Sequence, residues 1–176
     1  VKNGDNKELI WILEHPKTYT AGVSFKHNEI IDKKIKVIRT NRGGKLTLHN
    51  PGQKIIYLVI DLNHRKKDIR KLISAIENCI IEFLKIFEIE SKEDKKNIGI
   101  WVAEKKIAAI GLRVSKWVAF HGCSINISNN LKDYLKIIPC GLNNTKITSI
   151  YSEKKIIPNN YEKELVSILI KNLNKI

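Results

Sequence analysis

The stretch from Ile98 to Ile127, IGIWVAEKKIAAIGLRVSKWVAFHGCSINI, decides the fold that we expect for this chain. It is rich in β-branched and other apolar residues, and glycines interrupt it at positions 99, 111 and 122. Short apolar segments separated by glycines are typical of strands joined by turns. We therefore expect a meander of short strands in the middle of the chain.

Three further segments before this stretch also have strand character. Leu9 to Glu14 is a short apolar run that ends at His15-Pro16, and Lys36 to Thr40 alternates between apolar and polar residues. Lys54 to Leu62 is the richest in Ile, Val and Tyr, and is the clearest strand of the three. A sheet with strands from both halves of the chain is therefore expected.

Two segments show the apolar repeat of three and four residues that predicts an amphipathic helix. The first runs from Asp68 to Phe87, with Asp68 as its expected N-terminal cap. The second runs from Tyr161 to Leu173. Because these helices do not alternate with the strands, we expect an α+β fold with a mixed, mostly antiparallel sheet packed with helices.

Composition limits the class of protein. The 176 residues are 43% hydrophobic and 28% charged, which is typical of a globular chain, and no linker or repeat divides them, so we expect a single domain over residues 1–176. No apolar run approaches the roughly 20 residues that a membrane-spanning helix needs. A membrane protein is therefore excluded.

The net charge of +14 comes from 32 Lys and Arg against 18 Asp and Glu. A nucleic-acid partner would fit this charge, but the lysines are scattered, Tyr and Phe are sparse, and nucleic-acid-binding signatures are absent. A solvated basic surface, or steering toward an acidic protein partner, explains the charge better. We expect no nucleic-acid and no membrane partner.

The three cysteines cannot all pair within one chain, which favours a reducing compartment, and we expect the cytoplasm. Cys79 falls in the apolar face of the long helix and is expected in the core. Cys123 follows a glycine in a strand-like segment, where a structural role is slightly favoured. Cys140 lies between Pro139 and Gly141 in a turn, where Gly141 could present its amide to an oxyanion, so Cys140 is the candidate nucleophile against the alternative of an ordinary loop cysteine.

A thiol nucleophile needs a partner that accepts its proton or favours its thiolate. His49 and His121, both beside glycine-containing turns, are the candidate histidines. Lys105 and Lys106 are the candidate lysines, because small apolar neighbours would leave either ammonium partly desolvated, and an ammonium beside a thiol favours the thiolate. Adjacent strand residues face opposite sides, but periodicity does not choose between the two lysines.

The segment from Arg42 to Gln53 combines glycines, a threonine and a histidine between two expected strands. Its glycines permit close approach of the backbone to a ligand, and Arg42 could hold an anionic or carbonyl group. The segment lacks the spacing of a phosphate-binding loop or a dinucleotide-binding motif. A ligand-binding loop and a decorated hairpin are about equally good interpretations.

Three blocks of sequence, taken in order, resemble the lipoyl(octanoyl) transferases, the octanoyltransferases of lipoate biosynthesis. The matching residues are Arg42-Gly43-Gly44 with Thr47, His49 and Pro51-Gly52-Gln53; Lys106 to Arg113 with Phe120-His121-Gly122 and Asn126; and Ile138-Pro139-Cys140-Gly141-Leu142 with Thr148-Ser149. The resemblance covers most of the chain, from about Glu14 to Ile150.

The resemblance implies a fold like that of the biotin and lipoate protein ligases, and transfer of an octanoyl group from octanoyl-acyl carrier protein to a lysine of an apo lipoyl domain. Such domains belong to the 2-oxoacid dehydrogenases and the glycine cleavage protein. Cys140 matches the family nucleophile and Lys106 the lysine that favours its thiolate, and His121 is an alternative to Lys106 for removing the proton of the acceptor lysine. No cofactor and no metal are expected, and the chain is expected to act as a monomer.

The resemblance also assigns the residues that contact the substrate. They are Arg42, Gly43, Gly44, Lys45, Leu46, Thr47, Leu48, His49, Ala109, Ile110, Gly111, His121, Gly122, Cys123 and Ser124.

The chain departs from the family pattern at a few positions. Asn50 and Trp117 stand where glycines are usual, Cys123-Ser124 replaces a Leu-Ala pair, and the strand expected before Leu9 is mostly missing. The first three changes bear on pocket shape and on chain-length preference.

Two alternative functions remain open. One is an ATP-dependent lipoate- or biotin-type ligase of the same fold, which needs no nucleophilic cysteine, and the other is a basic binding module without enzymatic activity. A papain-like hydrolase fits less well.

Overall fold

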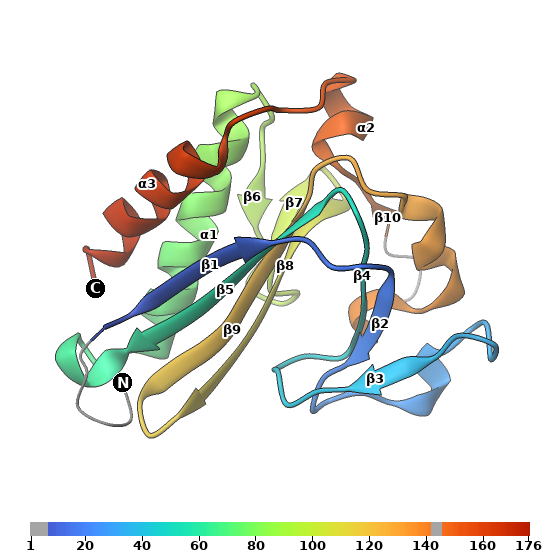
Figure 1. Ribbon diagram of the computed structural model, residues 1–176, viewed down its shortest axis with the longest axis horizontal. Helices are drawn as coiled ribbons and strands as arrows, with labels where there is room; N and C mark the ends of the chain where they lie inside the picture. Colours follow the sequence, from blue (N-terminus) through green and yellow to red (C-terminus); the bar gives the residue numbers. More distant parts are fainter. Residues whose placement is uncertain (1–6, 142–145) are drawn as a thin grey trace.

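The computed structural model describes residues 7–141 and 146–176, and its main element is a seven-stranded sheet (Figure 1). Neighbouring strands along its main path are antiparallel, and β10 joins β8 in parallel. The path runs through β1 (Leu9–Leu13), β5 (Gln53–Asp61), β9 (Val118–Asn126), β8 (Lys105–Ser115), β7 (Ile100–Val102) and β6 (Lys92–Glu93), with β10 (Lys146–Ile147) beside β8.

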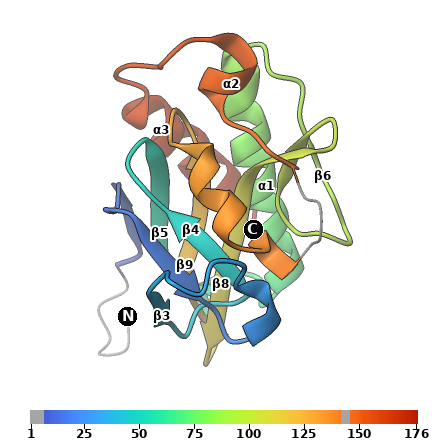
Figure 2. The ribbon, with the colours of Figure 1, turned by 90° about the vertical axis from the view of Figure 1, so that its right-hand side faces the viewer.

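A second, smaller sheet has the order β3-β2-β4. It contains β2 (Thr18–Ala21), β3 (Val37–Arg39) and β4 (Leu46–His49), with β2 parallel to β3 and antiparallel to β4. In Figure 2 this sheet stands in front of the main sheet, and α1 lies behind. Short 3₁₀ turns complete the connections: η1 (His27–Glu29), η2 (Leu62–His64), η3 (Leu131–Lys136) and η4 (Pro139–Gly141).

The helices are α1 (Ile69–Ile86), α2 (Ile150–Lys154) and α3 (Glu162–Leu173). α1 and α3 pack together and cover one face of the main sheet (Figure 1). The predicted cap is confirmed, because the Asp68 side chain accepts a hydrogen bond from the Lys71 amide at 3.0 Å. None of the helices in residues 7–141 and 146–176 is long and apolar enough to span a bilayer.

Alternation along the central strand β5 separates the helix side of the main sheet from the other side. Ile56, Leu58 and Ile60 are fully buried in the core formed with α1 and α3. Ile55 and Tyr57 are on the opposite face, where they line a cavity. The side of the sheet away from the helices therefore carries the site.

The predicted meander is confirmed in its antiparallel direction but is wrong in its detail. Gly111 and Gly122 do not end strands: they are paired directly with each other inside β8 and β9, which have 11 and nine residues. A Cβ at position 122 would collide with the Ile56 carbonyl oxygen, and one at position 111 would lie 3.4 Å from both the Arg42 Cδ and the Gly43 oxygen. Both glycines therefore allow close packing within and onto the sheet.

Candidate active site

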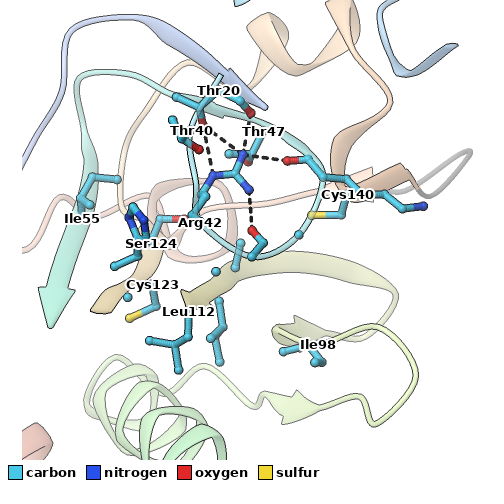
Figure 3. Close-up of a pocket in the computed structure, with 18 of the residues that line it drawn as sticks. Thr20, Thr40, Arg42, Thr47, Ile55, Ile98, Leu112, Cys123, Ser124 and Cys140 are labelled. Atoms are coloured by element: carbon cyan, nitrogen blue, oxygen red, sulfur yellow. Dashed lines mark hydrogen bonds between the residues drawn. The ribbon is translucent and has the colours of Figure 1, made fainter. Parts of the chain in front are cut away.

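A cavity of about 690 Å³ opens on the face of the main sheet opposite to α3, between the main sheet and the small sheet. Its walls come from β2, β4, β5, β8, β9 and the loop that carries Cys140, and Ile69 and Ile73 of α1 also line it. Figure 3 shows Arg42 in the centre of this pocket and the Cys140 sulfur pointing toward it. The exposed wall area is predominantly apolar, which suits an acyl chain.

Cys140 is presented by the strained turn η4. Its φ of +57° lies in the left-handed region, which is uncommon outside glycine. The turn is anchored to the segment at η1, because the Ile138 amide donates to the Glu29 carbonyl at 2.7 Å and Ile30 forms a bridge with Ile137. These contacts hold the half-buried thiol at the pocket wall. Leu142, which ends the predicted motif, lies outside the described residues.

Lys106 is the amine beside this thiol. Its Nζ lies 3.5 Å from the Cys140 Sγ, donates to the Ile98 carbonyl at 2.8 Å, and sits 5.3 Å from the centre of the Trp101 ring. The residue is only 4% exposed. The Lys106 Nζ thus contacts a carbonyl oxygen, an aromatic ring and the Cys140 sulfur, and it is placed to donate a hydrogen bond to that sulfur.

Lys105 points away from Cys140, so Lys106 is the one of these two lysines that lies beside the thiol, a choice that periodicity left open. Its Nζ is bound to Glu153, whose carboxylate also accepts from the Thr148 hydroxyl. The side chain is 37% exposed. Lys105 thus ties β8 to α2 and takes no part in the pocket wall.

Arg42 holds its own loop. The guanidinium donates to the carbonyl oxygens of Thr20, Gly43 and Lys45 at 2.5, 2.9 and 2.7 Å, and also to the Thr20 hydroxyl. Burial lowers its pKa, and the neighbouring Cys140 sulfur partly opposes that shift. Most of its donors are therefore engaged by the backbone, and the expectation that Arg42 holds a ligand oxygen stays a prediction.

The predicted histidines both line the pocket. Burial lowers the pKa of His49 to about 4, and the hydrogen bond from its Nδ1 to the Oε1 of Gln53 only partly opposes this shift. The imidazole is therefore neutral at physiological pH. His121 is bonded to Asn41 at 2.6 Å, and burial together with Arg42 and Arg113 lowers its pKa. Neither histidine is bonded to Cys140 in the described structure.

The other two cysteines are not poised for chemistry. Cys79 is buried in the main core, as predicted, and burial raises its pKa to about 12. Cys123 contacts the pocket but is also nearly fully buried, and burial raises its pKa well above the usual range. Both thiols therefore stay protonated.

The predicted substrate-contacting residues line the pocket, except Leu48. Alternation along β4 directs Thr47 and His49 into the pocket and leaves Leu48 fully buried in the small core with Tyr19 and Tyr134. The Gly141 amide also departs from expectation, because it donates to the Ile138 carbonyl at 3.1 Å and is not available to an oxyanion.

Sequence reasoning missed several walls of the pocket. Thr18 and Thr20 face it from β2, a strand too short to be recognised from its pattern. His15 and Tyr57, bonded at 2.7 Å, were also missed, because the sequence placed His15 at the end of one expected strand and Tyr57 within another. The alternation Thr-x-Thr in residues 18–20 was the one available signal for a polar wall.

The comparison with known families gives the class of protein. Residues 1–167 match the family described as the lipoyl protein ligase A/B catalytic domain, and the chain belongs to that family. Among solved structures, lipoate-protein ligase A bound with ATP superposes with a TM-score of 0.74 at 14% identity, over 97% of this chain and 73% of that one. The biotin protein ligase from Aquifex aeolicus with biotin and ATP gives 0.56 at 14% identity, over 89% and 68%. These likenesses confirm the predicted fold.

The sequence relatives narrow this class. A protein from Wolbachia pipientis subsp. Culex pipiens named octanoyltransferase is 48% identical over 157 residues, which is 85% of this chain and 76% of that protein. Another octanoyltransferase, from Novosphingobium aromaticivorans, is 38% identical over 175 residues, which is 96% and 79%. The resemblance to the octanoyltransferases that the three sequence blocks indicated is thus confirmed.

Proposed function

We propose that this chain transfers an octanoyl group from octanoyl-acyl carrier protein to a lysine of an apo lipoyl domain, through a thioester on Cys140. One observation carries the mechanism: the Cys140 Sγ lies 3.5 Å from the buried Lys106 Nζ at the wall of a mostly apolar pocket. The octanoyltransferase names of relatives at 38–48% identity support the choice of acyl group and partners.

In the first half of the reaction the Cys140 thiolate adds to the carbonyl carbon of the donor thioester. The carbonyl electron pair moves to oxygen and then returns, which breaks the bond between carbon and the donor sulfur. The departing sulfur takes a proton from the Lys106 ammonium and leaves as a thiol. The acyl group is then a thioester on Cys140, and Lys106 is a neutral amine.

In the second half neutral Lys106 accepts a proton from the ammonium of the acceptor lysine, which frees that amine to attack. The tetrahedral intermediate loses its second proton to solvent and expels the Cys140 thiolate, leaving an amide on the acceptor. Lys106 is again an ammonium beside a thiolate. The bond energy of the donor thioester drives both steps, so ATP is not needed.

The pocket walls supply the acyl site. Ile55, Ile110, Leu112 and Val114 offer apolar contacts along a channel that ends near α1. The rest of the wall surrounds the reacting carbonyl, Lys106 and the lysine of the acceptor domain. It consists of the segment 42–47, His49 and residues 121–124. We further propose that residues 1–176 form a single domain that acts as a monomer. We also propose that the protein works in the cytoplasm, because its three cysteines are free thiols, which are typical of a reducing compartment.

The rival function is an ATP-dependent ligase of the same fold. The solved lipoate and biotin ligases share only 14% identity with this chain, which supports a common fold alone, whereas the sequence relatives named above are octanoyltransferases. A ligase would also not require the thiol at position 140. The requirement for ATP separates the two functions.

The test is the intact mass of the enzyme after incubation with octanoyl-acyl carrier protein, without ATP. We expect wild type and the matched control Cys79→Ala, whose thiol lies in the main core away from the pocket, to gain one octanoyl group that hydroxylamine removes, and Cys140→Ala to gain none. An adduct on Cys140→Ala would reject this nucleophile. Modification that needs free octanoate and ATP would reject the transferase and support the ligase.

A further inference from the structure

The peptide bond between Lys45 and Leu46 is held from both sides by charged groups, the half-buried Arg42 and the buried Glu29. Its carbonyl oxygen accepts from the Arg42 Nη2 at 2.7 Å and from the Gly22 amide at 3.1 Å. Its N–H donates to the Oε2 of Glu29 at 2.9 Å. The backbone of residue 45 is therefore fixed, and so is the point from which its side chain leaves.

The Lys45 ammonium lies beside the residue that follows the nucleophile. A Cβ at Gly141 would overlap with the Nζ of Lys45, would lie 2.5 Å from its Cδ, and would lie 3.0 Å from the Oε1 of Glu29. Lys45 lines the same pocket as Cys140. Its side chain is 35% exposed, so the ammonium can reach a bound molecule.

Glu29 has a carboxylate oxygen that the fold leaves unused. The residue is only 3% exposed, and within the described residues its Oε1 accepts no hydrogen bond. The Lys45 Nζ lies 3.9 Å away, which is too far for a hydrogen bond but close enough for an ion pair. Among the residues that the structure describes, Lys45 is therefore held near Glu29 by charge and not by a hydrogen bond.

The proposed acyl transfer, on which this inference rests, needs a hydrogen-bond donor beside residues 140 and 141. When the Cys140 sulfur adds to the acyl carbonyl, negative charge develops on the carbonyl oxygen close to residues 140 and 141. The Gly141 amide is already bonded to Ile138, and the Arg42 guanidinium is engaged by its own loop. The Lys45 ammonium lies beside Gly141, and within residues 7–141 and 146–176 it donates no hydrogen bond.

We infer that Lys45 is a catalytic residue that donates a hydrogen bond to the acyl oxygen as it becomes negative, and that Glu29 is its positioning residue. The carbonyl electron pair moves onto oxygen while the carbon–sulfur bond to Cys140 forms, and returns as the bond to the leaving sulfur breaks. Lys45 keeps its proton throughout. Proton transfer and thiolate stabilisation belong to Lys106, so the two lysines have separable tasks.

Two reactions of the same thiol separate those tasks. Alkylation by iodoacetamide needs the thiolate but forms no oxyanion, whereas acylation by octanoyl-acyl carrier protein needs both. We expect Lys45→Met to slow single-turnover acylation, followed by intact mass, on the order of 100-fold, the usual loss when one oxyanion donor is removed. Its rate of alkylation against pH should match wild type, which also shows that the site is folded. Lys45→Arg should recover much of the acylation rate.

Glu29 is tested through its coupling to Lys45. We expect Glu29→Gln to slow acylation about tenfold in the wild-type background and to add nothing in the Lys45→Met background, because a positioning residue acts only through its partner. A purely structural role would slow both backgrounds equally. The control Lys85→Met, which removes an exposed charge from α1, should acylate like wild type.

The outcomes are distinguishable from failure of the proposed function itself. If wild type forms no adduct, the acyl transfer is wrong. If wild type is acylated and Lys45→Met is acylated at the same rate, the role of Lys45 is overturned. A Lys45→Met variant whose alkylation is slowed as much as its acylation would show that Lys45 acts on the thiol and not on the oxyanion.

Discussion

At the scale of single residues, Cys140 is held in a conformation that costs energy. A non-glycine residue in the left-handed region is destabilised by roughly 1–2 kcal/mol, and the φ of Cys140 is +57°. The contacts of Ile137 and Ile138 with Ile30 and Glu29 impose this conformation on the turn. Strain of this kind is often retained where it aims a reactive group, and here it directs the sulfur toward Lys106.

The pair of lysines on β8 gives a matched test of thiol activation. We expect Lys106→Ala to move the pH dependence of iodoacetamide alkylation toward higher pH, because the thiolate loses its neighbouring ammonium. Lys105→Ala should alkylate like wild type, since the Lys105 ammonium is bound to Glu153. Identical profiles for wild type and Lys106→Ala would reject the pairing of Lys106 with Cys140.

The protonation state of His49 follows from its neighbours. The Gln53 Nε2 donates to the Oδ1 of Asn126 and to the Tyr134 hydroxyl, both at 2.8 Å, so its Oε1 faces the Nδ1 of His49. This network assigns the ring proton to Nδ1 and leaves Nε2 as an acceptor. Burial lowers the pKa of His49 to about 4, so that the ring is neutral in the folded state.

This burial makes stability depend on pH. The unfolded chain binds the proton of residue 49 at its ordinary pKa of 6.5, above the folded value of about 4. The contribution of neutral His49 to the free energy of unfolding is therefore fully present above pH 6.5 and is lost as the pH falls toward 4. Between pH 7 and pH 5 this loss amounts to about 2 kcal/mol. Urea unfolding at these two pH values should show a smaller loss for His49→Gln than for wild type. Equal losses would contradict the buried neutral imidazole.

At the scale of elements, the hairpin between β8 and β9 carries avoidable strain. Lys116 and Trp117 form its turn, with φ values of +51° and +64°. Turns of this kind prefer Asn and Gly, because both central residues need positive φ. The exposed side chain of Lys116 makes it the simpler position to change.

Replacement of Lys116 should therefore stabilise the fold. We expect Lys116→Asn to raise the free energy of unfolding by about 0.5 kcal/mol, because Asn tolerates the left-handed region better than Lys. Lys116→Ala removes the same charge without that tolerance and should be close to wild type. Thermal unfolding of the three proteins tests this, and a gain shared by both variants would assign the effect to charge.

Elements with strong local signals could be predicted from the sequence. The apolar repeat and Asp68 located α1 within one residue at each end, and the Ile-rich run located β5. β2 and β4 were missed because four residues show little periodicity. Gly111 and Gly122 were wrongly expected to end strands. In the sequence, a glycine that allows close packing inside a sheet cannot be distinguished from one that ends a strand.

The site was predictable where chemistry is local, and not where it depends on tertiary contacts. Cys140 was a candidate from its Pro-Cys-Gly setting, whereas strand periodicity left Lys105 and Lys106 open as its partner and only the family resemblance named Lys106. The contact itself depends on the fold, which brings β8 to η4. Arg42 was recognised as a pocket residue, yet its bonds to Thr20 and Lys45 depend on the pairing of β2 with β4. Glu29 gave no signal at all, because a lone glutamate in a loop is normally solvated.

At the scale of the whole molecule, charge and pocket act together. The chain carries a net charge of +14, and lysines such as Lys45 and Lys96 line the pocket. A positive field raises the rate at which an acidic protein meets the surface, and salt screens it over roughly 8–10 Å at physiological ionic strength. Delivery of acyl groups by an acidic carrier should therefore be limited by encounter.

The salt dependence of turnover measures this steering. We expect kcat/KM for octanoyl-acyl carrier protein to fall at least about tenfold as sodium chloride rises from low millimolar to half molar, mainly because association slows. A small neutral donor, octanoyl-N-acetylcysteamine, forms the same acyl-enzyme without an acidic surface and should show little change. If both donors lose activity in parallel, salt acts on the site itself, for instance on the Lys106–Cys140 pair. If neither does, the basic surface plays no part in recognition of the carrier.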